Sequence, residues 1–178
     1  MVFGLSSFVR KEVIANKNRN YWDLDKMRGK SIKKGVRTMS ISNEKLIELL
    51  NKDLALEYAA AIQYIQHAAV MTGAQYGDII KELKVHANEE IGHAIILADQ
   101  IDFLGGVPTA DVGQIKTSPD NIEMLEQDLE GEEGAITRYK IRIEQAEEVK
   151  ELALAQQLRN ILAVEQEHAM DLKQALGK

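Results

Sequence analysis

The sequence lacks cysteine altogether, contains only two prolines and has no long uninterrupted apolar run. Without cysteine the chain can form no disulfide and no thiolate-held zinc or iron–sulfur site, so oxygen and nitrogen atoms must hold any metal ion. No run approaches the ~18 apolar residues of a membrane-spanning helix, so we expect no membrane partner. Pro108 and Pro119 are the only prolines, which leaves long stretches free to be helical.

The composition is that of a helical globular protein. The 178 residues suit one compact domain, and the shares of hydrophobic residues (45%) and charged residues (28%) are ordinary for such a domain. Ala, Leu, Ile, Glu, Gln and Lys are abundant, and all of them favour helix.

The charges are distributed unevenly along the chain. Residues 1–38 carry ten Lys or Arg against three Asp or Glu, a balance of +7, while the remainder carries twelve against twenty-five, a balance of −13. An acidic body attracts cations, and a basic arm suits an acidic neighbouring subunit, DNA or another anion. We therefore divide the chain into a basic N-terminal arm, residues 1–40, and a helical body, residues 41–178. Organelle targeting by the arm is a third interpretation; otherwise we expect a cytoplasmic protein.

Hydrophobic periodicity predicts four long helices in the body. They run from Lys45 to about Met71, from Tyr76 to Leu104, and over residues 119–147 and 149–176. Ser118 and Pro119 are typical of a helix start, and Gly105-Gly106 of a helix end. Short connections favour antiparallel hairpins, and residues 105–118 are long enough to cross the length of a bundle. The predicted fold class is all-α, an antiparallel four-helix bundle with one long crossover between the second and third helices.

A Glu-x-x-His pattern occurs twice, as Glu90-Ile-Gly-His93 and as Glu165-Gln-Glu-His168. At this spacing both side chains project from one face of a helix, about one turn apart, as in one half of a dinuclear metal site. The two copies are 75 residues apart, and the same offset relates the first predicted helix to the third. There Asp53, Glu57, Ala60 and Tyr64 recur as Asp128, Glu132, Ala135 and Tyr139. One offset that relates all four helices predicts a single pseudo-twofold centre.

This repeat predicts a dinuclear metal centre inside the bundle. Glu90 and Glu165 share helices with the two histidines and are expected to bridge two ions, while Glu57 and Glu132 each complete one ion. Carboxylate and imidazole ligands with open positions suit iron or manganese and admit O2 or peroxide. The six predicted ligands are Glu57, Glu90, His93, Glu132, Glu165 and His168.

Four side chains are expected to support these ligands. Asp53 and Asp128 lie one turn before the terminal glutamates and are candidates to accept the outer N–H of a ligating histidine. Tyr64 and Tyr139 lie two turns beyond those glutamates. They are either core residues or catalytic participants that hydrogen-bond a ligand or donate an electron.

Three other residues near the ligands are expected to play lesser parts. Glu89 adjoins a ligand but should point elsewhere on its helix, toward solvent or another subunit. His67 and His86 are expected to be ordinary core or surface histidines. His86, one turn before Glu90, is also a candidate for a place behind the site or on an ion path.

Over residues 43–176 the chain resembles the bacterioferritin branch of the ferritin-like superfamily, and it is also similar to Dps-like proteins with such a centre. The resemblance rests on the ligand spacing, on Ala61-Ile62-Gln63-Tyr64, and on Phe103-Leu104-Gly105-Gly106-Val107-Pro108 at the start of the crossover. It implies a ferroxidase, which oxidises Fe(II) to Fe(III) with O2 or peroxide at a centre of two iron ions per subunit. It also implies iron storage in a homo-oligomeric cage.

Departures from the family pattern narrow this expectation. Bacterioferritins place a haem-ligating Met directly after the second-helix glutamate, and Ile91 stands there in this chain, so we expect no haem. Ten residues follow His168, which leaves no room for a fifth helix and favours a 12-mer over a 24-mer. The alternatives are a Dps-like protein that protects DNA through residues 1–38, and a non-cage di-iron or manganese oxidase or peroxidase. A rubrerythrin-like peroxidase fits less well, because Ala135 replaces an additional glutamate.

Overall fold

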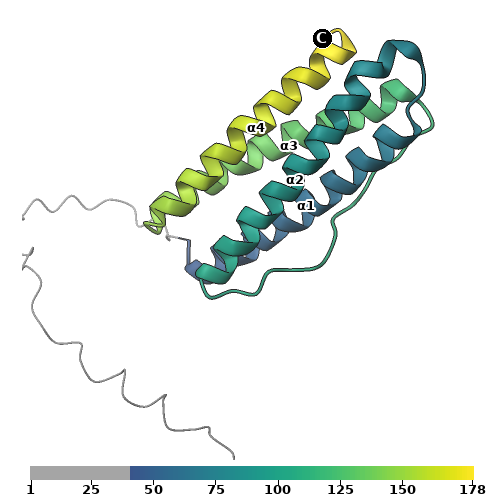
Figure 1. The fold of residues 1–178 in the computed structure, drawn as a ribbon. Helices are drawn as coiled ribbons and strands as arrows, with labels where there is room; N and C mark the ends of the chain where they lie inside the picture. Colours follow the sequence, from purple (N-terminus) through teal and green to yellow (C-terminus); the bar gives the residue numbers. More distant parts are fainter. Residues whose placement is uncertain (1–40) are drawn as a thin grey trace, which may run out of the picture. The chain divides into compact units, whose positions relative to one another are not determined.

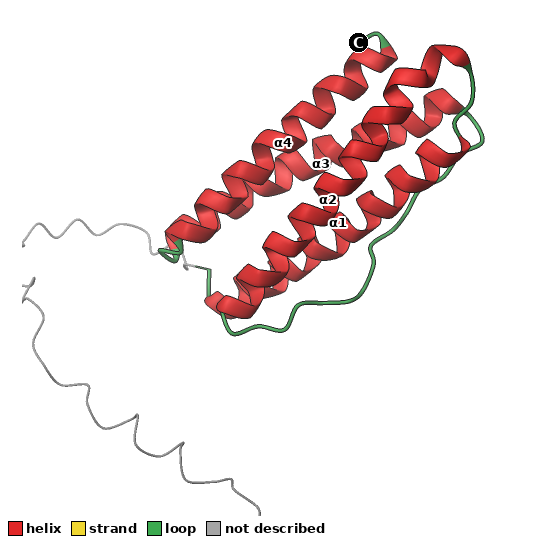
Figure 2. Cartoon of the chain, in the orientation of Figure 1, coloured by secondary structure: helices red, strands yellow, loops and turns green. Residues whose placement is uncertain are grey.

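A computed structural model describes residues 41–178. The basic arm, residues 1–40, lies outside the described residues. The hypotheses that the arm binds DNA, packs on a neighbouring subunit or acts as a targeting segment therefore stay predictions. Within the described range four long helices run side by side and there is no strand (Figure 2). The elements are α1 (Asn43–Val70), the 3-10 helix η2 (Ala74–Tyr76), α2 (Gly77–Phe103), α3 (Asn121–Glu148) and α4 (Leu152–Leu176).

The helices form two hairpins that pack against each other. Helix α1 packs along α2 and α3 packs along α4, while α1 also contacts α3 and α2 contacts α4. The segment between α2 and α3 runs the length of the bundle beside α1 (Figure 1). The predicted all-α four-helix bundle with one long crossover is therefore confirmed. Among residues 41–178 there is no helix with the length and hydrophobicity of a membrane span.

The crossover is fastened to α1 at two points that bear on the interior. The N–H of Gly113 donates to the carbonyl of Ala55 at 2.7 Å, and a Cβ at this glycine would lie only 3.0 Å from that oxygen. The side chain of Gln63 accepts a hydrogen bond from the Lys116 N–H at 2.7 Å. Because Gln63 also donates to buried Asp128 at 2.8 Å, it ties the crossover to the polar centre of the bundle.

The predicted start of α3 is two residues too early. Asp120, not Ser118, is the N-cap, and its carboxylate accepts the Glu123 N–H at 2.9 Å. Ser118 stands outside the helix, where its hydroxyl accepts the Asp120 N–H at 3.0 Å and donates to the Glu123 carboxylate at 2.7 Å. Both residues are good caps, and the aspartate lies nearer the first helical turn.

Helix α4 begins at Leu152, later than the predicted residue 149. The chain turns at Lys150, a non-glycine residue with φ of 71°, and the Glu151 N–H donates back to the Ala146 carbonyl at 2.9 Å. This closure of α3 is the kind that glycine usually makes. No glycine marks it here, which explains why the periodicity alone placed the boundary early. Gly177 ends α4 as predicted, with φ of 69°.

Two apolar clusters fill the bundle on either side of a polar layer. One contains Leu46, Leu50, Leu97 and Leu158 among others, and the second contains Leu83, Leu125 and Leu172. Between them lie buried acidic and histidine side chains, each no more than 5% exposed. So many buried ionisable groups in one layer are costly unless they neutralise one another or bind cations.

Candidate metal centre

All six predicted ligand side chains converge in this polar layer. Each helix contributes: Glu57 from α1, Glu90 and His93 from α2, Glu132 from α3, and Glu165 and His168 from α4. They form two overlapping clusters in which one ligand atom of every residue lies within 4.8 Å of the others. The first cluster adds Glu57 and His93 to Glu90 and Glu165, and the second adds Glu132 and His168 to the same pair. Glu90 and Glu165 are therefore the two residues that the clusters share, and their role as bridging ligands stays a prediction.

The Nδ1 atoms of the two histidines face the carboxylates at similar distances. For His93, Nδ1 lies 3.1 Å from Glu165, 3.3 Å from Glu90 and 3.6 Å from Glu57. For His168, Nδ1 lies 3.1 Å from Glu90, 3.6 Å from Glu132 and 3.7 Å from Glu165. Ligand atoms that surround one ion at about 2.1 Å lie about 3–4 Å from one another. The two clusters are thus the right size for one ion each.

Several buried atoms of these residues lie close to one another but make no well-aligned hydrogen bond among the described residues. They are Oε1 of Glu90, both carboxylate oxygens of Glu165 and Nδ1 of His168. Buried polar atoms are almost always paired, so four unpaired atoms that face one space call for a ligand. Carboxylate oxygens and an imidazole nitrogen together suit a divalent first-row metal ion.

The pKa values of both bridging carboxyls are raised when no ion is bound. Burial raises the pKa of Glu90 to about 8, and the nearby Glu57 carboxylate adds to the shift. Burial likewise raises the pKa of Glu165 well above its ordinary value. Burial acts in the same direction on Glu57, but hydrogen bonds from Glu90, His93 and Tyr139 outweigh it and lower the pKa. The pKa shifts therefore favour the protonated form of the bridging pair and the ionised form of Glu57.

The histidines also hold protons. Burial alone would lower the pKa of His93, but Glu165, Glu57 and Glu90 raise it to about 12. At His168 burial again opposes ionisation, and Glu132 and Glu90 raise the pKa to about 11. Two protonated imidazoles and two protonated carboxyls thus balance the charge of the metal-free layer. Two divalent ions would supply the same positive charge as these four protons.

Each terminal glutamate accepts a hydrogen bond from a tyrosine on the opposite helix. Tyr139 on α3 donates to Glu57 on α1 at 2.6 Å, and Tyr64 on α1 donates to Glu132 on α3. Burial, reinforced by the nearby carboxylates, raises the pKa of both hydroxyls well above 10, so both remain donors. The tyrosines are where the sequence placed them. An electron-donating role for either one stays a prediction.

The structure corrects the expected partners of Asp53 and Asp128. Neither carboxylate contacts a histidine of the centre. Asp53 instead accepts from Arg142 at 2.6 and 3.3 Å and lies 3.5 Å from Arg138. The reason is geometric: each aspartate lies one turn beyond the ligand layer and faces the neighbouring helix rather than the centre.

Asp128 has a different pair of partners at the equivalent positions. Both of its oxygens lie 2.9 Å from Nδ1 of His67, and Gln63 donates to one of them at 2.8 Å. Burial raises the pKa of Asp128, and the hydrogen bond from His67 opposes that shift. His67 is thus a fully buried partner of Asp128, which is the core alternative of the core or surface roles expected for it.

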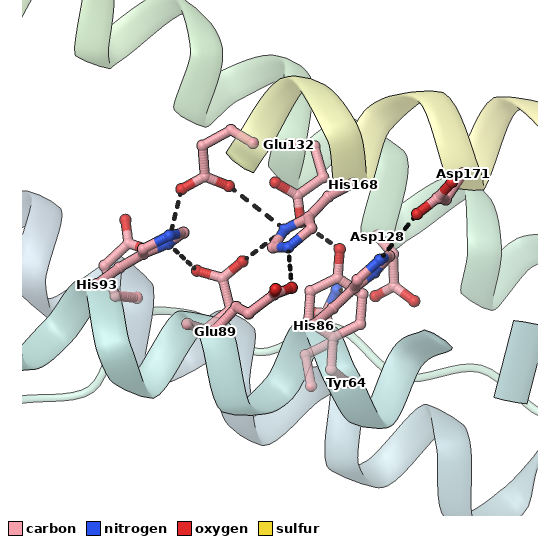
Figure 3. Close-up of polar contacts among 12 residues, drawn as sticks. Tyr64, His86, Glu89, His93, Asp128, Glu132, His168 and Asp171 are labelled. Carbon is pink, nitrogen blue, oxygen red and sulfur yellow. Dashed lines mark hydrogen bonds and ion pairs between the residues drawn. The ribbon is translucent and has the colours of Figure 1, made fainter. Parts of the chain in front are cut away.

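The sequence missed the outer partner of His168. Glu89, expected to point away, accepts from Nε2 of His168 at 2.9 Å and leaves Nδ1 facing the centre (Figure 3). This is the contact that orients a ligating imidazole. The sequence offers only the spacing of Glu89 three residues after His86, which puts both side chains on one face of α2. The contact itself depends on α4, where the ring of His168 stacks on that of His86 with centroids 4.0 Å apart.

A cavity of about 250 Å³ reaches the centre from the α1–α3 side of the bundle. Its inner wall includes the carboxylates of Glu57, Glu90, Glu132 and Glu165. Its outer wall includes Lys116 of the crossover, and small residues of α1 and α3 line the passage: Ala60, Gly131, Gly134 and Ala135. The cavity is large enough for small molecules such as O2 or peroxide to approach the ligands.

Comparisons with known proteins place this arrangement in context. A family model described as a ferritin-like domain matches residues 47–178. The bacterioferritin of Brucella melitensis is 32% identical over 125 residues, which cover 70% of this chain and 78% of that protein. The bacterioferritin of Desulfovibrio desulfuricans is 30% identical over 125 residues, which cover 70% of each chain.

Two solved structures are similar over nearly the whole described range. A ferritin-like diiron-carboxylate protein of Bacillus anthracis is 37% identical, with a TM-score of 0.74, and the match covers 78% of this chain and 99% of that one. A bacterioferritin-related protein of Bacteroides fragilis, described as a dodecameric thioferritin, is 32% identical, with a TM-score of 0.72 and coverage of 78% and 88%. The resemblance to the bacterioferritin branch is confirmed by these matches.

Proposed function

The chain belongs to the ferritin-like family, and from this premise we propose that it is a ferroxidase that oxidises Fe(II) to Fe(III) at the six-residue centre. The observation that carries the proposal is the pair of ligand clusters that share Glu90 and Glu165. Relatives named bacterioferritin support iron storage and ferroxidase activity at a general level. In this proposal Fe(II) is the substrate and O2 or peroxide is the oxidant.

The reaction balances with two iron ions per chain. Each Fe(II) loses one electron, and O2 takes up the two electrons and two protons to leave as hydrogen peroxide. With peroxide as the oxidant, the same two electrons and two protons break its O–O bond and give two molecules of water. A site for two ions side by side is therefore suited to a two-electron oxidant.

The chain's own residues have distinct parts in this proposal. Glu90 and Glu165 lose their protons as ions enter and then hold both ions at once. Glu57 and Glu132 hold one ion each, and their hydrogen bonds from Tyr139 and Tyr64 fix the orientation of the carboxylates. Six ligands from four helices make the spacing of the two ions a property of the bundle rather than of a loop.

The test is aerobic addition of Fe(II) to the metal-free protein. We expect a rapid ferric absorbance that saturates at two irons per chain. Glu165→Gln removes one carboxylate from both clusters and should abolish this phase, while Glu167→Gln, an exposed change two residues later on the same helix, should leave it intact. A rapid phase that survives in Glu165→Gln would place the oxidation elsewhere.

We further propose that the chain assembles into a hollow 12-mer that stores ferric mineral. A dodecameric protein of Bacteroides fragilis with 32% identity supports this size. Several large apolar side chains of α1 and α2 are exposed and suit burial between subunits. They are Ile62 (42%), Ile65 (57%), Ile91 (45%) and Ile95 (58%). Native mass spectrometry tests the proposal, and a monomer or dimer would instead favour the non-cage oxidase or peroxidase.

The metal ion is open to a separate test. Carboxylate and imidazole ligands suit manganese as well as iron, so elemental analysis of protein purified without added metal identifies the ion that the centre takes up. Ile91 stands at the position of the haem-ligating Met in bacterioferritins. The expected lack of haem remains a prediction, and a visible absorption spectrum of the purified protein checks it.

A further inference from the structure

A third group of potential ligands lies between α2 and α4, outside the six-residue centre. Glu82 and His86 project from α2 and Asp171 from α4, and one ligand atom of each lies within 4.8 Å of the others. We infer that these three residues form an additional site for a divalent cation, which we call the outer site. Two carboxylates and one imidazole are a donor set for first-row divalent ions, and the two negative charges offset the charge of one ion.

The state of His86 is the observation that points to a ligand. Its side chain is only 2% exposed, yet its Nδ1 has no hydrogen-bond partner among the described residues. Its Nε2 lies 3.4 Å from the Asp171 carboxylate, beyond the usual 2.7–3.2 Å of a good N–H···O hydrogen bond (Figure 3). A buried imidazole without one good protein hydrogen bond is rare. A cation between Nε2 and the two carboxylates would give this buried ring the strong polar contact that it lacks on the Asp171 side.

The internal repeat shows that the bundle itself does not require these residues. The offset of 75 residues maps Glu82 onto Gln157 and His86 onto Ile161, and it maps Ile96 onto Asp171. The repeat-related place therefore has an amide and two isoleucines, which cannot hold a divalent ion. The two repeat-related places have the same backbone arrangement, and at one of them uncharged and mostly apolar side chains pack the helices. Packing therefore does not explain why carboxylate and imidazole groups are present at the outer site.

The outer site is adjacent to one half of the centre. The rings of His86 and His168 stack with centroids 4.0 Å apart and an interplanar angle of 28°. Glu89, one turn after His86 on α2, contacts Nε2 of His168 at 2.9 Å and is itself 44% exposed. A line of ligand groups thus leads from exposed Glu82 past His86 and Glu89 to the His168 cluster. If the proposed ferroxidase function is correct, the outer site supplies Fe(II) to that cluster.

The experiment uses Zn²⁺ as the probe, because this ion binds carboxylate and imidazole without redox chemistry. Crystals of the full chain are soaked in Zn²⁺ and anomalous density is measured at the zinc edge, with equilibrium dialysis to count ions. We expect three ions per chain, two in the centre and one between Glu82, His86 and Asp171. Glu82→Gln/Asp171→Asn should lose only the outer ion and bind two. Asp99→Asn/Glu167→Gln, which removes the same number of negative charges from the same two helices, should still bind three.

The outcomes separate the outer site from the proposed function. Two ions in the centre and none at Glu82, His86 and Asp171 would overturn the outer site and leave the ferroxidase proposal standing. An outer ion beside an empty centre would support the outer site and contradict the ferroxidase proposal. A third ion that persists in Glu82→Gln/Asp171→Asn would also overturn the outer site. In Fe(II) oxidation, Glu82→Gln/Asp171→Asn should be several-fold slower than Asp99→Asn/Glu167→Gln, because Fe(II) reaches the centre through the outer site.

Discussion

The two halves of the centre have different surroundings. Next to Glu57 and His93 lie two arginines, which contact Asp53. Next to Glu132 and His168 lie a glutamine and two histidines. The offset of 75 residues relates Arg138 to Gln63 and Arg142 to His67. The two arginines contact Asp53 in one half, and the amide and the imidazole contact Asp128 at the equivalent positions in the other half. The two halves share their ligands and backbone but differ in charge. This comparison teaches that the repeat specifies where the carboxylate and imidazole groups of the centre lie, and the surrounding residues make its two halves different.

The largest effect should come from the residues that both halves share. Glu165→Gln removes a ligand from both clusters and should reduce Zn²⁺ binding from two ions in the centre to none, with affinity at least about 100-fold weaker. Glu57→Gln and Glu132→Gln should each lose only one ion, on the His93 side and the His168 side respectively. Anomalous diffraction distinguishes the positions. If Glu57→Gln empties both positions, the two halves are not separable.

The pH dependence of metal binding should be steep. Without ions, the pKa is about 12 for His93 and about 11 for His168, so both imidazoles carry a proton at pH 7. The pKa of Glu90 is raised to about 8 and that of Glu165 is raised well above its ordinary value, which favours a proton on each carboxyl as well. These protons must leave before the atoms can bind a cation, so affinity rises with pH, by up to about tenfold per pH unit for each proton displaced. Calorimetry with Zn²⁺ in buffers of different ionisation enthalpy should show about four protons released at pH 7. Release near zero would contradict the balance of charges described for the metal-free layer.

The outer aspartates should differ in their effect on stability. Asp53→Asn leaves the buried guanidinium of Arg142 without its counter-charge, which should lower the free energy of unfolding by about 3–5 kcal/mol. Asp128→Asn leaves a partner, His67, that can be neutral, so the loss should be only about 1–3 kcal/mol. Urea denaturation of the metal-free proteins measures both. Equal losses would mean that the arginine and the histidine play the same part.

The smallest effect should be confined to one histidine. Glu89→Gln weakens the interaction that orients His168, whereas the repeat-related residue on α4 is Val164, which offers His93 no such partner. We expect the ion on the His168 side to bind about 10-fold more weakly and the ion on the His93 side to be unchanged. Zn²⁺ titration of Glu89→Gln and of the control Val164→Ala measures the difference. Equal weakening of both ions in Glu89→Gln would show that Glu89 acts on the whole centre.

The repeat made much of the fold and the centre predictable. Each helix carries its ligands on the face that its apolar residues also define, so Glu57, Glu90, Glu132 and Glu165 could be assigned to one interior from spacing alone. The helix ends were less predictable, because caps compete locally: Asp120 replaced Ser118, and Lys150 closed α3 without a glycine.

The contacts between helices were decided by tertiary structure. The sequence determined that four helices meet at four carboxylates and two imidazoles, because periodicity fixes which side chains share a face of one helix. It did not determine that Asp53 reaches Arg142, that Glu89 reaches His168, or that His86 meets Asp171 across α2 and α4. Those pairs depend on how far each helix is rotated and shifted against its neighbour, and that follows from the packing of the whole core.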